Sequence, residues 1–198
     1  MKSNICKIEN GTQDLVAILK ESERVAEYNG LTHKQALQLR LICEELDGML
    51  PNIVDDFSGD VWIEYEEGTC KVIASIRIPD ITVAKKEDLI DVAKNKKNAS
   101  AVGIVGKIRD AVENFFIMDS AMSNFDTYTG SFRLSTGYSE GVDYNYLWSL
   151  ATYRDTVTVE ETEAWDELEK SVIASVADDV VVGIKGKKAE IIITKKFA

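Results

Sequence analysis

THKQALQLRLICEELDGML, residues 32–50, predicts the buried helix around which we expect the rest of the chain to be arranged. Thr32 and Gln35 have the spacing of a capping box, in which each side chain bonds the other residue's backbone N–H, so the helix should begin near Lys34. Pro51 is expected to end it, because proline has no N–H for the helical ladder. A broad apolar stripe predicts that this helix packs under a sheet; it comprises Leu39, Ile42, Cys43, Leu46, Met49 and Leu50.

Two adjacent carboxylates in this helix differ in their position relative to the stripe. Glu45 lies one turn from both Leu41 and Met49 and therefore borders it, whereas Glu44 points away from its centre. Two interpretations of Glu45 remain open. It is either a boundary residue with its carboxylate in water or a partly buried general base.

Length and charge set limits on the class of protein. A chain of 198 residues with 45% hydrophobic content is long enough for one globular domain with a proper core. Its net charge of −11 argues against nucleic acid or an anionic membrane surface as the main partner, because such partners require a basic surface. A basic protein partner is permitted.

The cysteines and the N-terminal residues indicate a compartment. Cys6, Cys43 and Cys70 are odd in number and have no paired spacing, which favours reduced, buried thiols over a disulfide framework or a zinc site. We find no signal peptide and no apolar run long enough to cross a bilayer. The expectation is a cytoplasmic protein with no membrane partner.

The first half of the chain alternates clear helix and strand patterns. We expect an edge strand over 4–9 and an amphipathic helix over 12–28, which Asn29 and Gly30 end. After the helix at 32–50, residues 60–66 and 70–78 are predicted to form a hairpin through the turn at Glu67 and Gly68. A short helical face is expected within 85–97.

The second half contains a less regular segment. Residues 100–118 predict a helix that opens with Gly103 and Gly106, which suggests close backbone approach to a neighbour. Residues 119–155 are rich in aromatic, Ser, Thr and Gly residues and predict strands or a long loop, either packed as a β-layer or exposed to a partner. A second capping box, Thr158 with Glu161, opens an acidic helix predicted to reach 177, and strands are expected at 180–184 and 189–194.

This order of elements resembles the GHKL superfamily, the ATP-binding domains of sensor histidine kinases, gyrase-type ATPases, heat-shock chaperones and anti-sigma-factor kinases. Residues 41–46, LICEEL, look like the start of the family's N-box helix, and residues 101–106, AVGIVG, are similar to its second glycine box. The resemblance implies one α+β domain, a two-layer sandwich with the Bergerat ATP-binding fold, carrying an insertion over 119–177 before the last strands.

The resemblance also implies roles for particular residues. Glu45 stands at the position of the catalytic base, and Gly103, Gly106 and Lys107 would hold the phosphates of ATP at a helix N-terminus. Asp80 is the residue available to recognise adenine. Met49 occupies the position of the family's magnesium-binding asparagine, and a thioether is a poor ligand for this cation, so no metal ligand is assigned.

Two functions follow as alternatives. The first is a regulatory ATP-binding protein of the anti-sigma or histidine-kinase type, with a regulatory protein partner and room for a homodimer. The second is a degenerate relative that acts through protein contacts without nucleotide. The one histidine, His33, lies in the capping turn and is expected to be exposed, which argues against a Ser-His-Asp triad.

Overall fold

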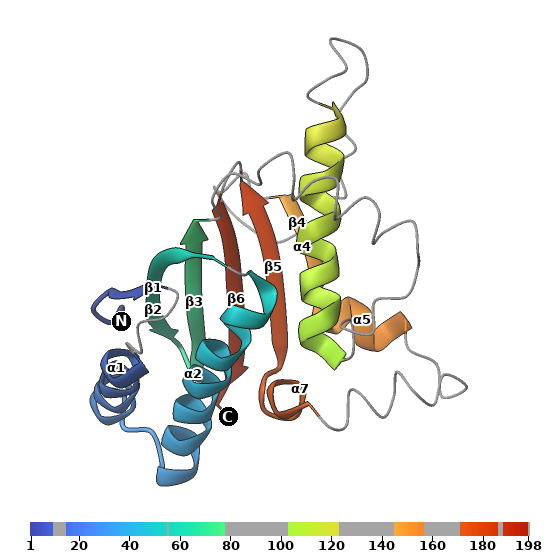
Figure 1. Ribbon diagram of the computed structural model, residues 1–198. Coiled ribbons are helices and arrows are strands. Elements are labelled where there is room, and N and C mark those ends of the chain that lie inside the picture. Colours follow the sequence, from blue (N-terminus) through green and yellow to red (C-terminus); the bar gives the residue numbers. More distant parts are fainter. Residues whose placement is uncertain are drawn as a thin grey trace.

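A six-stranded antiparallel sheet forms the centre of the structure, a computed structural model that describes residues 1–9, 15–54, 56–77, 103–122, 145–156, 171–185 and 188–197. In space the strands follow the order β1-β2-β3-β6-β5-β4 (Figure 1). Strand β6 therefore lies between the β2–β3 hairpin and β5. The strands are β1 (Cys6–Glu9), β2 (Ser58–Glu66), β3 (Thr69–Arg77), β4 (Asn145–Ser149), β5 (Asp179–Lys185) and β6 (Lys188–Lys196).

Three long helices cover one face of this sheet. Figure 1 shows α1 (Leu15–Tyr28), α2 (His33–Ile53) and α4 (Gly103–Met122) in front of the strands, with α2 between the other two. Two short helices, α5 (Leu150–Thr156) and α7 (Val172–Val176), lie near the end formed by β4 and β5. This mixed architecture agrees with the predicted α+β class.

Several local predictions are confirmed. Thr32 caps α2, its hydroxyl accepting from the Gln35 N–H while the Gln35 side chain accepts from the Thr32 N–H. Gly30 follows α1 with a φ of +64°, and Gly68 turns the hairpin with a φ of +80°. Glycine adopts this left-handed backbone without the Cβ penalty of other residues. The edge strand and the two closing strands are present as β1, β5 and β6.

Two predicted helix boundaries are wrong. Pro51 does not end α2, which continues to Ile53, because Leu50 and Ile53 are buried in the core while Pro51 sits on the exposed side. Packing there outweighs one missing backbone hydrogen bond. The helix predicted to reach 177 does not run through Ser171, because the backbone of Ser171 is extended and its hydroxyl caps α7, which begins at Val172.

The core lies between the helices and the sheet. Alternate residues of each strand point toward the helices, so β3 buries Cys70, Val72, Ala74 and Ile76 against α2. Residues 78–102, 123–144 and 157–170 lie outside the described part, and so do the predictions made on them, including the short helical face at 85–97 and the second capping box. Strand β4 lies within the insertion predicted at 119–177, and it joins the central sheet as an edge strand.

Candidate functional site

The acidic pair of α2 is divided between two flanks of the helix. Arg40 donates to Glu44 one turn later and to Glu23 of α1, both at 3.0 Å, so this flank faces α1. Glu45 is the residue after Glu44 and lies 100° further around the helix axis. It is therefore on the other flank of α2, next to the edge of the buried stripe that lies away from Arg40. Because α4 packs against α2 on the side away from α1, half-buried Glu45 lies on the flank turned toward α4 (Figure 1).

Met49 extends the same flank into the core. It lies one turn after Glu45 and is 3% exposed, packed within the apolar cluster beneath α2. A buried thioether offers no oxygen to a hard cation. The position at which the resemblance places the magnesium ligand is therefore part of the hydrophobic core.

The predicted phosphate-binding residues form the first turns of α4. Gly103 opens the helix with a φ of +82°, and a Cβ built on it would meet no atom of the described residues within 4 Å. The positive φ, and not the expected close approach of a neighbour, therefore explains why a glycine stands at this position. Gly106 is buried and Lys107 half-buried, while Ile104 and Ile108 anchor the turn in the core.

The structure thus brings Glu45 and the Gly103–Lys107 turn onto adjacent helices on the same face of the sheet. A helix N-terminus presents backbone N–H groups without intrahelical acceptors and the positive end of the helix dipole. Asp80 lies outside the described residues. His33 is exposed, as predicted. Among the described residues no three His, Cys, Asp or Glu side chains are grouped to hold a metal ion, and no helix there has the length and apolar content to cross a bilayer.

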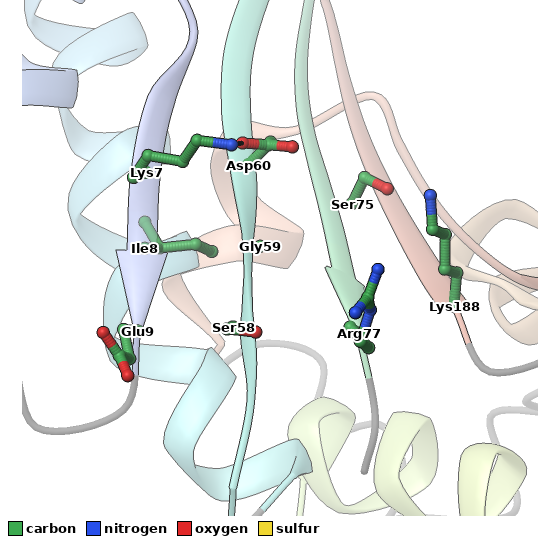
Figure 2. Close-up of a pocket in the computed structure, with 9 residues that line it drawn as sticks. All are labelled: Lys7, Ile8, Glu9, Ser58, Gly59, Asp60, Ser75, Arg77 and Lys188. Carbon is green, nitrogen blue, oxygen red and sulfur yellow. Dashed lines mark hydrogen bonds and ion pairs between the residues drawn. The ribbon is translucent and has the colours of Figure 1, made fainter.

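A separate hollow lies on the face of the sheet opposite the helices. It has a volume of about 430 Å³ and spans one end of β1, β2, β3 and β6 (Figure 2). Lys7 and Asp60 pair across β1 and β2 at 2.5 Å. Figure 2 shows Ser75, Arg77 and Lys188 gathered between β3 and β6 on the same side of the sheet. Its floor includes Gly59, where the backbones of β2 and β3 approach closely.

Basic side chains outnumber acidic ones in this hollow, which is lined by Lys7, Arg77 and Lys188 and by Glu9 and Asp60. Arg77 of β3 is directly opposite Lys188 of β6, and Lys188 is directly opposite Lys185 of β5. Within the described ranges neither Arg77 nor Lys188 has an ion-pair partner. Cross-strand like charges are destabilising. The opposed cations Arg77 and Lys188, with Lys185 next in register, form a basic row that is unusual in a chain with a net charge of −11.

An apolar band separates this basic end from the rest of the face. Trp62, Ile73, Ile192 and Val181 are successive cross-strand neighbours on β2, β3, β6 and β5. Beyond the band, Glu64 is paired. It accepts from the Trp62 indole at 2.8 Å and pairs with Lys2 at 3.2 Å. Burial alone would raise the pKa of Glu64, but these hydrogen bonds and the lysine charges outweigh it and lower the pKa.

Sequence reasoning does not find the basic row, because Arg77 is far from Lys188 in the chain and meets it only through the pairing of β3 with β6. The available signal is that Arg77 lies next to the end of the strand predicted at 70–78, while Lys185 and Lys188 flank the turn between two other predicted strands. Comparisons with protein-family models, with curated proteins and with solved structures find no match to the chain.

Proposed function

We propose that this protein is a regulatory nucleotide-binding domain of the GHKL type that holds the phosphates of ATP at the N-terminus of α4 and has lost magnesium-dependent phosphoryl transfer. The observation that carries this proposal is the placement of α2 and α4 side by side on one face of the sheet, with Glu45 on the flank turned toward α4. The order of the described elements is compatible with that family.

The N-terminus of α4 supplies the chemistry for anion binding. Gly103 adopts a left-handed backbone, and no atom of the described residues lies within 4 Å of a Cβ built on it, so this part of the structure leaves space for an anion beside the first turn. Lys107, one turn into the helix, adds a positive charge. The apolar side chains of Ile104 and Ile108 hold this turn in place against the core.

Met49, at the position of the family's magnesium ligand, is the reason to expect that catalysis is lost. Phosphoryl transfer in ATP-using enzymes depends on a metal ion that bridges the phosphates and neutralises their charge. With Met49 buried in the core, α2 offers no ligand at that position. Binding of ATP should therefore be independent of magnesium, and the protein should act through a regulatory protein partner that senses the bound state.

A titration of the protein with ATP, with and without magnesium, tests this proposal. We expect binding in both conditions and no release of phosphate. Gly103→Ala should weaken binding, because the helix start must either shift or accept a strain of roughly 1–2 kcal/mol. Gly30→Ala is the matched control, since Gly30 also has a positive φ and open space but lies at the far end of α1.

Three results would contradict the proposal. Absence of binding at millimolar ATP would favour the second function, a protein-interaction module without nucleotide. Equal weakening by Gly103→Ala and Gly30→Ala would show that the effect comes from lost stability and not from the α4 site. Turnover that depends on magnesium and is lost in Glu45→Gln would contradict the inference from Met49.

A further inference from the structure

We propose that the hollow at the end of β1, β2, β3 and β6 is a binding site for a doubly charged oxyanion of the phosphate type, seated between Ser75, Arg77 and Lys188. This site lies on the opposite face of the sheet from Glu45 and α4 and is independent of the nucleotide proposal. The inference rests on uncompensated charge, on available donors and on the shape of the surface.

Two cations with no ion-pair partner among the described residues lie side by side in this hollow. Arg77 and Lys188 occupy directly opposed positions on the neighbouring strands β3 and β6. Opposed like charges cost stability, and departures from such local rules are expected at functional sites. Among the described residues, neither cation has an ion pair with an acidic residue. Asp60 is paired with Lys7 across β1 and β2, and Glu9, which also lines the hollow, lies on β1, two strands from Arg77. No ion pair joins Glu190 to Lys188, two residues away on the same strand.

The donors match a tetrahedral dianion better than a carboxylate. A guanidinium presents parallel N–H groups that bind two oxygens at once, and an ammonium adds a compact charge. Figure 2 shows the Ser75 hydroxyl on the same side of the sheet, next to Arg77 along β3 and beside the Lys188 side chain of the neighbouring strand. A carboxylate would leave one of two cations uncompensated, whereas a dianion balances both Arg77 and Lys188.

The surface around the two cations bounds the proposed anion-binding site on two sides. The hollow has a volume of about 430 Å³, and the Lys7–Asp60 pair lies on the side of β1 and β2. Toward the middle of the strands, the hollow is bordered by the apolar band, which begins at Trp62 and Ile73. The Ile73 side chain is only 6% exposed. Ionic interactions beside such a low-dielectric surface are stronger than those between fully hydrated charges.

Backbone amide chemical shifts measured during titration with inorganic phosphate, at about pH 8 where the phosphate is doubly charged, test this inference. Sodium chloride at matched ionic strength controls for screening. We expect saturable shifts centred on Ser75 to Arg77 and on Lys188 to Glu190. Arg77→Gln and Lys188→Gln should each weaken binding at least about tenfold, since each removes a charged hydrogen bond. Lys71→Gln is the matched control, because Lys71 is on the same face of β3 but beyond the apolar band, opposite Glu64.

A second measurement separates binding from folding. Without phosphate, Arg77→Gln and Lys188→Gln should melt at the same temperature as the wild type or higher, because they relieve repulsion between opposed cations. With phosphate, they should lose the rise in melting temperature that the wild type shows. A lower melting temperature for both variants without phosphate would assign them a structural role and overturn the inference.

The source of the phosphate group is resolved by comparing inorganic phosphate with a phosphoserine peptide in the same titration. Binding of either at the named amides supports the site, and the tighter ligand identifies the source. Shifts that sodium chloride reproduces, or that persist in the double variant of Arg77→Gln and Lys188→Gln, would overturn it. ATP binding at α4 should survive in this double variant, so the two proposals can fail separately.

Discussion

Gly59 offers the sharpest test of the packing between β2 and β3. It pairs with Ile8 on one side and with Ile76 on the other, so its strand is held from both directions. An alanine Cβ at this position would lie 2.3 Å from the carbonyl oxygen of Ser75 and 2.8 Å from the Cα of Ile76. Both contacts are with backbone, which cannot rotate away as a flexible side chain can.

The magnitude follows from these contacts. Overpacking of a well-ordered interior costs about 1–3 kcal/mol when side chains can adjust, and contact with a backbone fixed on both sides places Gly59→Ala at the upper end of this range. A loss of about 3 kcal/mol lowers the melting temperature of a domain of this size by roughly 6–12 °C.

Gly48→Ala is the control with the opposite expected sign. Gly48 lies inside α2, is exposed, and a Cβ added to it would meet nothing within 4 Å. Replacing glycine by alanine in a helix interior should therefore raise the free energy of unfolding by about 0.5–1 kcal/mol. Denaturant unfolding followed by circular dichroism measures both variants. If Gly59→Ala unfolds within about 0.5 kcal/mol of the wild type, the close approach of the β2 and β3 backbones is refuted.

Three further predictions concern single side chains. Burial alone would raise the pKa of Glu21, but hydrogen bonds from Asn4 and a neighbouring arginine lower it below its ordinary value of 4.5. The stability that this ionised carboxylate contributes is complete above pH 4.5 and is lost as the pH falls through the lower folded pKa. Urea unfolding should therefore show Glu21→Gln about 2 kcal/mol less stable than wild type at pH 7 and a shrinking difference in acid. Thr32→Ala should lower the free energy of unfolding by about 1 kcal/mol, because it removes the cap of α2; an unchanged denaturation midpoint would contradict this. Burial raises the pKa of the Cys43 thiol and raises that of Cys70 to about 12. A thiol reagent should accordingly label neither residue until denaturant is added, and rapid labelling of the native protein would refute their burial.

Local sequence signals predict the elements whose determinants are close in the chain. The capping box of Thr32 and Gln35 requires residues only three positions apart, and the turn at Gly68 joins strands that alternate clearly on either side. The helix predicted over 100–118 is present as α4, which is described from Gly103 to Met122. In each case the deciding interactions lie within a few residues and need no knowledge of the tertiary structure.

Non-local packing decides what the sequence does not predict. Pro51 carries a strong stop signal, but Leu50 and Ile53 on either side are buried, and their packing extends α2 past it. Ser171 interrupts a pattern that is periodic throughout. The basic row cannot be predicted, since Arg77 and Lys188 become neighbours only when β3 pairs with β6.

The candidate site shows the same division. Glu45 and Gly103 are predicted from patterns within their own helices, whereas the contact between those helices follows from the sheet beneath them. That Glu45 faces α4 depends on the tertiary structure. The hydrogen bond from Arg40 to Glu23 shows which flank of α2 faces α1, and Glu45 lies on the other flank.

The position of β6 has a consequence for how the protein is made. On the ribosome the β2–β3 hairpin emerges early. The second neighbour of β3 in the sheet is β6, which is synthesised after all the other strands of the sheet. Until then β3 presents an unpaired, largely apolar edge, which nascent-chain chaperones would have to shield. Translation rate through the segment before β6 should therefore influence the yield of native protein more than the rate over the N-terminal helices.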